Sequence, residues 1–177
     1  MEDLSLHVLD IAENAIRAGA SLVEISVERD TEKDMLCISV KDNGRGMDED
    51  FLKMVDDPFV TTRTERHVGL GLPLLKQSAQ ETGGNLEVKS EPGKGTEGKA
   101  SFQANHIDMK PLGDMEATLI TLIVGNPEVD FIYRADLDGK KVEVDTREFD
   151  KMLGQGAHRS SPQALRLLRT LLSGGNQ

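Results

Sequence analysis

The segment Asp42-Asn43-Gly44-Arg45-Gly46-Met47 constrains the fold of this chain more than any other part of the sequence. It directly follows Met35–Lys41, where Leu36, Ile38 and Val40 alternate with other residues as on one face of a β-strand. Two glycines within three residues let a backbone turn sharply and approach another group closely. The pattern predicts a strand that ends in a tight loop. Taken alone, the segment could be a plain turn after a strand.

A predicted helix upstream places three polar residues on one face. The helix is expected over Leu6–Ala18, with Ser5 as its N-cap. At 100° per residue, Asp10, Asn14 and Arg17 lie within about 60° of one another. An acid, an amide and a cation therefore share one side of the helix. A solvated polar face is the alternative interpretation for such a group.

Two further glycine-containing segments follow the loop. Gly69-Leu70-Gly71-Leu72 precedes a predicted helix over Leu72–Thr82, and Gly93–Thr96 separates two predicted strands, Leu86–Ser90 and Lys99–Gln103. Glycines at the start of a helix let backbone amides approach anionic groups. The first of these segments is not a Walker A loop, because no Gly-Lys-Ser/Thr follows it.

In this order, the four segments resemble the motifs of the ATP-binding domain shared by DNA gyrase, heat-shock chaperones, sensor histidine kinases and mismatch-repair ATPases, the GHKL superfamily. The resemblance covers roughly residues 4–106. It implies the Bergerat fold, which is an α+β class fold: an α/β sandwich with helices on one face of a mixed sheet. It also implies ATP and Mg²⁺ as cofactors.

The resemblance assigns roles to the polar face of the first helix. Asn14 matches the asparagine whose side-chain oxygen holds Mg²⁺ between the phosphates, and a neutral oxygen suits this hard cation. Asp10 matches the acid that activates water in the ATPase branch or a serine hydroxyl in the anti-sigma kinase branch. The family usually has Glu there, one methylene longer. Arg17 falls where histidine kinases often carry a basic residue. Asp10 is thus the expected catalytic residue, with Asn14 and Arg17 as cofactor ligands.

The loop after the second strand and the later turn match the adenine end of the family site. Asp42 corresponds to the carboxylate that accepts a hydrogen bond from the adenine amine. Gly44 and Gly46 allow positive φ and are expected to let the backbone close on the base. Met47 is expected to pack against the base or the core. Thr96 matches the threonine that helps hold the water network beside the base, and a hairpin-turn residue is the alternative.

The resemblance places the phosphates at the start of the downstream helix. The expected ligands there are Gly69, Leu70, Gly71 and Leu72. The preceding run from Pro58 to Arg63 is similar to the Phe-Thr-Thr-Lys run of histidine kinases, which makes Thr62 and Arg63 further candidates, with Arg63 facing the phosphates. Residues 57–68 are expected to form a lid that nucleotide orders. The sequence differs from such kinases at His67-Val68, where they usually place Gly and Ser/Thr.

The resemblance does not extend to the C-terminal part, and the chain is divided into residues 1–108 and 109–177. Capping and turn signals in the second part predict a small αββα appendage of helix, hairpin and two short helices: Met115–Val124, Val129–Ala135 with Lys141–Val144, Thr146–Leu153 and Pro162–Leu172. A buried strand is the alternative for the first of these. We expect this part to be an interaction module that binds a protein partner or a second copy of the chain.

Bulk properties exclude several classes of function. The 177 residues carry a net charge of −10, which disfavours a nucleic-acid partner because phosphate backbones require clustered Lys and Arg. The single Cys37 makes no internal disulfide. The chain starts with Met1-Glu2-Asp3, unlike a secretory signal, and no apolar run approaches the ~18 residues of a membrane span. We therefore expect a cytoplasmic protein without a membrane partner. His7 is expected at the surface or as a helix cap.

The sequence thus predicts an Mg-ATP-binding regulatory protein that acts as a kinase-like or ATPase signalling module. The alternative is a nucleotide-gated protein-binding module with little or no catalysis. A DNA-acting ATPase is disfavoured by the negative charge. A self-contained sensor kinase is not expected, because the first motif begins at Asp10 and leaves no room for a phosphoacceptor hairpin. The sequence specifies neither the partner nor the phosphoacceptor.

Overall fold

The computed structural model describes residues 3–55 and 71–174. The elements of the first part are α1 (Leu4–Arg17), β1 (Leu22–Asp30), β2 (Met35–Asp42) and α2 (Glu49–Val55). They are followed by α4 (Gly71–Glu81), β3 (Asn85–Glu91) and β4 (Gly95–Gln103). The last part contains α5 (Met115–Gly125), β5 (Asp130–Leu137), β6 (Lys140–Asp145), α6 (Thr146–Leu153) and α7 (Pro162–Leu172). Within the described residues, no helix is both long and apolar enough to span a bilayer.

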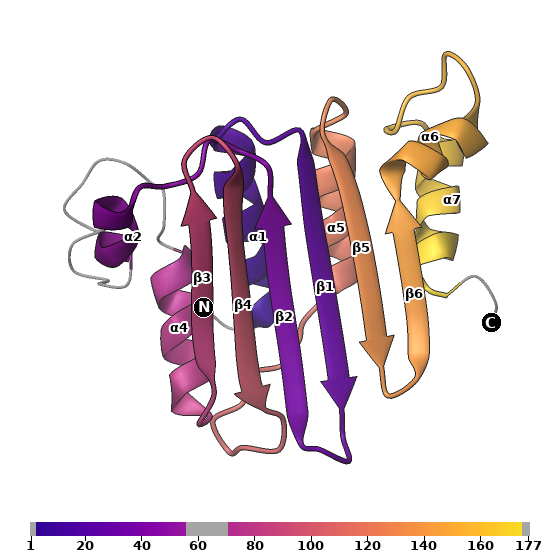
Figure 1. Cartoon of the computed structure of the whole chain (residues 1–177). Coiled ribbons are helices and arrows are strands. Elements are labelled where there is room, and N and C mark those ends of the chain that lie inside the picture. The colour runs from indigo at the N-terminus through magenta and orange to yellow at the C-terminus, as the bar shows by residue number, and fades with distance from the viewer. Residues whose placement is uncertain (1–2, 56–70, 175–177) are drawn as a thin grey trace.

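All six of these strands join one mixed sheet in the order β3-β4-β2-β1-β5-β6 (Figure 1). Only the β1–β5 pair is parallel within this described sheet. Helices α1, α4, α5 and α7 lie behind the sheet in the view of Figure 1, and α1 packs against both α4 and α5. In β1, the buried Val23, Ile25 and Val27 alternate with more exposed residues, as expected for a sheet covered on one face. The predicted fold class is confirmed.

Two helix starts show how local and tertiary signals combine. The predicted cap of α1 was wrong: Asp3, not Ser5, is the N-cap, and its Oδ1 accepts hydrogen bonds from the Leu6 amide at 3.1 Å and the Ser5 hydroxyl at 2.6 Å. By contrast, Asp114 caps α5 as predicted, because its Oδ1 accepts from the Ala117 amide at 2.9 Å. The segment that follows Asp114 is therefore a helix and not the alternative strand.

The C-terminal segment extends the same sheet instead of forming a sheet of its own. β5 pairs with β1 over eight registered positions, from Leu22 opposite Asp130 to Arg29 opposite Leu137. The segment that leads into α5 is also bound to α1, since the Leu4 amide donates to the Pro111 carbonyl at 3.0 Å. Buried residues of both parts form one continuous core. The division at residue 108 stays a prediction, and the shared sheet favours interdependent folding.

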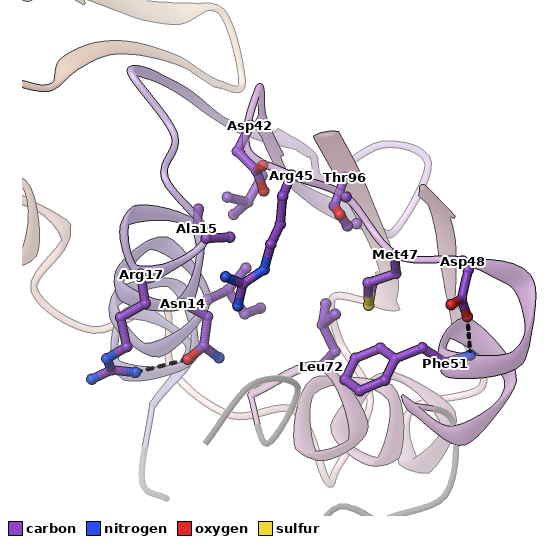
Figure 2. Close-up of a pocket in the computed structure, with 15 residues that line it drawn as sticks. Asn14, Ala15, Arg17, Asp42, Arg45, Met47, Asp48, Phe51, Leu72 and Thr96 are labelled. Atoms are coloured by element: carbon purple, nitrogen blue, oxygen red, sulfur yellow. Dashed lines mark hydrogen bonds between the residues drawn. The ribbon is translucent and has the colours of Figure 1, made fainter. Parts of the chain in front are cut away.

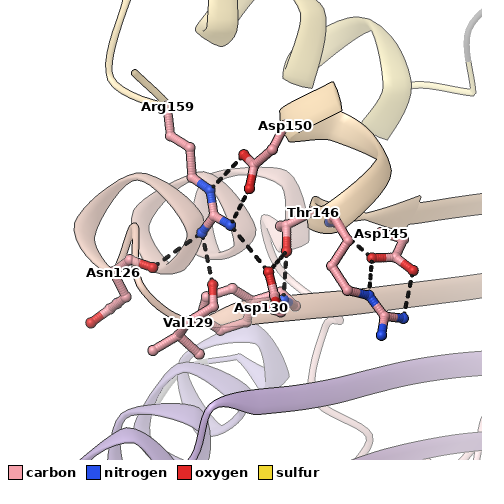
Figure 3. A network of polar contacts seen from close by, with 9 residues as sticks. Asn126, Val129, Asp130, Asp145, Thr146, Asp150 and Arg159 are labelled. Carbon is pink, nitrogen blue, oxygen red and sulfur yellow. Dashed lines mark hydrogen bonds and ion pairs between the residues drawn. The ribbon is translucent and has the colours of Figure 1, made fainter. Parts of the chain in front are cut away.

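One arginine ties the loop before α7 to the start of β5 (Figure 3). Arg159 is only 5% exposed. Its guanidinium donates to both carboxylate oxygens of Asp150, at 3.0 and 2.9 Å, and to the Val129 carbonyl at 2.7 Å. It also donates to the Asn126 carbonyl and to Asp130. We call this group, Arg159 with its four partners, the Arg159 clamp.

His7 lies in the core of the helical layer, so the prediction of a surface or capping position was wrong. Its side chain is fully buried, and neither ring nitrogen has a hydrogen-bond partner. Burial, followed by the nearby Lys110 cation, lowers the pKa of His7 to about 4. The residue is therefore a neutral packing group in the folded chain at pH 7.

Candidate functional site

A cavity of about 640 Å³ opens between α1, the end of β2, the start of α4 and β4 (Figure 2). Its volume falls in the range of small-molecule and cofactor sites. The residues that line it are Ile11, Asn14, Ala15, Arg17, Ala18, Val40, Asp42, Arg45, Gly46, Met47, Asp48, Phe51, Leu72, Thr96 and Gly98. Apolar and polar groups thus face one another across a single hollow.

The two glycines of the loop after β2 serve different geometric needs. Gly46 has a φ of 71°, and a Cβ there would collide with the Glu91 carbonyl of the neighbouring strand. Gly44 is not among the positive-φ residues, so it does not use the conformational freedom that glycine allows. A Cβ on Gly44 would instead lie 2.9 Å from the Ala18 carbonyl. The loop is therefore wedged between α1 and the β3–β4 hairpin.

Asp42 presents a half-buried carboxylate at the end of β2. Its Oδ1 accepts a hydrogen bond from the Gly44 amide at 2.8 Å. Burial raises the pKa of Asp42, and backbone hydrogen bonds from Gly44 and Thr96 partly oppose that shift. A partly desolvated carboxylate is a strong acceptor for a donor that enters the cavity.

A hydroxyl group that the sequence did not single out connects Thr96 to the loop. The Ser90 hydroxyl accepts from the Met47 amide at 2.8 Å and donates to the Gly95 carbonyl at 3.0 Å. It also lies 2.7 Å from the Thr96 hydroxyl. Because the Ser90 proton is directed to Gly95, Thr96 acts as donor to Ser90. Thr96, which lines the cavity, then keeps lone pairs that can accept from a water or a ligand.

On α1, the amide and the cation of the predicted polar face are hydrogen-bonded to each other. Arg17 Nη1 donates to Asn14 Oδ1 at 2.8 Å, and Arg17 Nη2 lies 3.8 Å from Glu13. Both Asn14 and Arg17 line the cavity. The oxygen expected to bind a cation is therefore held by a neighbouring guanidinium in this structure.

Asp10 lies one turn before Asn14 on α1, toward the start of the helix. It does not line the cavity that the described residues enclose. A Cβ placed on Gly71 would lie 3.3 Å from the Asp10 Cβ, so the start of α4 packs directly against this part of α1. Burial raises the pKa of Asp10, while Arg17 opposes the shift. The raised pKa makes Asp10 a stronger base than a fully solvated aspartate.

The structure brings together part of the predicted site. The predicted residues that line the cavity are Asn14, Arg17, Asp42, Gly46, Met47, Leu72 and Thr96, while Gly44 and Gly71 support its walls. Thr62, Arg63, Gly69, Leu70 and the predicted lid lie outside the described residues. Sequence reasoning missed Phe51 on α2 and Arg45, whose side chain enters the cavity (Figure 2).

A family sequence model described as histidine kinase-, DNA gyrase B- and HSP90-like ATPase matches residues 2–108, more than half of the chain. The chain belongs to this family. Its ATP-binding domain is of the GHKL type, and the predicted resemblance is confirmed.

Among curated relatives, this family member is 42% identical to sporulation kinase E of Bacillus subtilis over 89 residues, which cover 50% of the chain and 12% of that kinase. It is 35% identical to sporulation kinase C of the same organism over 88 residues, or 50% of the chain and 20% of that kinase. The chain thus spans a minor part of these relatives.

Among solved structures, the Aquifex aeolicus MutL ATPase domain complexed with ADP superimposes with a TM-score of 0.51 and 18% identity. The match covers 98% of this chain and 69% of that one. At this identity the likeness concerns the fold alone. The structural match includes the C-terminal part of the chain, whereas the family model ends at residue 108.

Proposed function

We propose that the chain binds Mg-ATP in this cavity and acts as a histidine-kinase-like regulatory module that hydrolyses or transfers the terminal phosphoryl group. One observation carries the proposal. Three separate elements, α1, the end of β2 and β4, direct Asn14, Asp42 and Thr96 to one cavity of nucleotide size in a member of an ATPase family.

The end of the cavity at Asp42 has the chemistry that an adenine base requires. The carboxylate accepts from an exocyclic amine, and the free lone pairs of Thr96 can hold a bridging water beside it. Met47, Phe51 and Leu72 supply apolar surface for the planar ring (Figure 2). A guanine base would place a carbonyl oxygen where adenine has its amine, and this oxygen would face the Asp42 carboxylate. Adenine is therefore the preferred base.

Asn14 fits the proposed role of Mg²⁺ ligand because it lines the cavity and carries a neutral carboxamide oxygen. Bound Mg²⁺ would neutralise phosphate charge, which an acidic chain with a net charge of −10 needs at this site. Arg17 has to release the Asn14 oxygen when the cation binds, and its guanidinium is then free to pair with phosphate oxygens.

Asp10 is the proposed general base, acting on water or on a hydroxyl of a partner. Its position outside the cavity lining favours the second candidate function, a nucleotide-gated protein-binding module with little catalysis. In both versions residues 109–177 bind a protein partner or a second copy, and the chain is cytoplasmic. Neither candidate function involves binding to a nucleic acid.

Calorimetric titration with ATP, ADP and GTP, each with and without Mg²⁺, tests the binding proposal. We expect saturable, adenine-specific binding that Mg²⁺ strengthens. Asn14→Ala should weaken binding only when Mg²⁺ is present. Binding of ATP and GTP with equal affinity would argue against the assigned base pocket.

Incubation with γ-labelled ATP separates the two candidate functions. Release of labelled phosphate, or transfer of label to a protein, supports the catalytic version. Asp10→Asn should then suppress turnover while leaving affinity for ATP roughly unchanged, because the shape is kept and the base is lost. Equal turnover in this variant would remove Asp10 from the mechanism.

A further inference from the structure

Arg45 occupies a fixed backbone position at the mouth of the cavity. Its amide donates to the Ala18 carbonyl of α1 at 3.0 Å, and its carbonyl accepts from the Gly93 amide of the β3–β4 turn at 2.7 Å. Both flanking residues, Gly44 and Gly46, are packed too tightly to accept a Cβ. The backbone of Arg45 is therefore held in place both by the end of α1 and by the β3–β4 turn.

From this position the side chain enters the cavity and runs past Asp42 toward Asn14 (Figure 2). Asp42 and Thr96 mark the end of the cavity suited to a base, whereas Asn14 and Arg17 mark the end suited to anionic groups. The Arg45 guanidinium lies on the side of Asn14 and Ala15 in this view. Its charge is thus directed to the sugar and phosphate side of a bound nucleotide.

Arg45 also differs in its partners from five arginines of the described residues, and unlike the exposed Arg166 and Arg169 of α7 it lines the cavity. Arg29, Arg134, Arg147 and Arg159 each pair with at least one carboxylate, and Arg17 with Asn14 and Glu13. The Arg45 guanidinium makes no hydrogen bond or ion pair to any residue of 3–55 and 71–174. A guanidinium presents donors in a fork that matches phosphate oxygens. An unpaired one facing a cavity in an acidic chain is available for an anionic ligand.

We propose that the Arg45 guanidinium pairs with a phosphate group of the bound nucleotide and so makes the site prefer nucleotides over nucleosides. The inference rests on the proposed function and adds a ligand-contacting residue to it. Because the charge-assisted bond is made to phosphate only, it should contribute to the affinity for AMP and ADP and not to that for adenosine.

The test compares adenosine, AMP and ADP binding to the full chain with Arg45→Gln and Arg45→Lys. ADP is titrated by calorimetry, and the weaker ligands are followed by ligand-observed NMR. Arg166→Gln is the matched control, since Arg166 is exposed on α7 and the same charge is lost away from the cavity. Thermal unfolding of each variant verifies that it folds.

We expect Arg45→Gln to weaken AMP and ADP about tenfold and to leave adenosine unchanged. Arg45→Lys should retain part of the affinity because the charge is kept and the fork is lost. The control should bind like the wild type. Equal losses for adenosine and ADP, or a loss as large in Arg166→Gln, would overturn the phosphate contact. Unchanged ADP affinity in a folded Arg45→Gln chain would overturn it as well. A wild-type chain that binds no adenine nucleotide would refute the proposed function itself.

Discussion

Asp42 is the residue on which base recognition depends most, because its carboxylate is half-buried and faces the cavity. Asp42→Asn replaces a charged acceptor by a neutral amide of the same shape. We expect a loss of about 1.5–3 kcal/mol, or roughly ten- to hundredfold in ADP affinity by calorimetry.

Asp48→Asn is the matched control for this substitution. Asp48 lines the same cavity and accepts from the Phe51 amide at 2.8 Å, a bond that asparagine can also make. ADP should bind this variant as it binds the wild type. If the two variants lost affinity equally, the effect would reflect the charge of the cavity and not base recognition by Asp42.

His7 should make the folding stability depend on pH. Its pKa is about 4 in the folded chain, below the ordinary value of 6.5, so the unfolded chain binds more protons between these two values. The free energy of unfolding should therefore rise from pH 4 to pH 6.5 and level off above, by about 3 kcal/mol from this residue.

Urea unfolding at several pH values tests this dependence, with His7→Leu as the reference that removes the titrating group and keeps a packing side chain. Other titrating groups affect both proteins alike, so the difference between their pH profiles isolates the histidine. Parallel profiles from pH 4 to 7 would show that His7 is not buried in its neutral form.

The residues that sequence reasoning placed in the site are those whose motif fixes their position. Asn14, Asp42 and Thr96 were named from short patterns, and the structure directs all three to one cavity. Arg45 and Ser90 were missed because nothing local marks them. The role of Ser90 depends on its pairing with Thr96 across the β3–β4 hairpin, a register that composition does not specify.

At the scale of elements, the Arg159 clamp joins the loop before α7 to the start of β5. Arg159→Met should lower the free energy of unfolding by about 2 kcal/mol, because the buried Val129 carbonyl and the partly exposed carboxylates of Asp130 and Asp150 lose their donor. Chemical denaturation measures this directly.

Arg147→Met is the matched control for the clamp. Arg147 also pairs with a carboxylate, that of Asp145 at 2.8 Å, but half of its side chain is exposed. Exposed ion pairs contribute little to stability, so this variant should unfold like the wild type. If Arg159→Met and Arg147→Met had the same free energy of unfolding, the burial of Arg159 would not contribute to the stability of the chain.

The start of α1 shows why element boundaries were harder to predict than the elements themselves. Asp3 and Ser5 are both good N-cap residues. The choice is made elsewhere in the chain, since the Leu4 and Ser5 amides donate to the Pro111 and Leu112 carbonyls. With these early amides satisfied by a distant segment, the helix begins two residues before the predicted start.

At the scale of the whole molecule, the sequence predicted the C-terminal elements but not their place in the sheet. Turn signals predict that β5 is one strand of a hairpin, yet no local pattern indicates that it pairs in parallel with β1, about a hundred residues earlier. α5 likewise covers α1, and its Thr118 hydroxyl donates to the Ser5 carbonyl at 3.3 Å.

Truncation after Asp108 tests how far the two parts depend on each other. The predicted division at residue 108 implies that residues 1–108 alone keep ATP binding. The shared sheet changes that expectation, because truncation exposes the edge of β1 and the side of α1 that packs against α5. We expect the truncated chain to unfold at lower urea concentration or to aggregate. An unchanged unfolding midpoint with full ADP affinity would show two independent units.

The central claim is that the cavity between α1, β2 and β4 binds an adenine nucleotide. Titration of the ¹⁵N-labelled full chain with Mg-ADP, followed by amide NMR, tests it most directly. We predict saturable shifts at Asn14, at the loop 42–47, at Leu72 and at Thr96, with small changes in α7. Shifts that gather instead around the smaller hollow between α5 and β6, or no saturation with ADP, would contradict the claim.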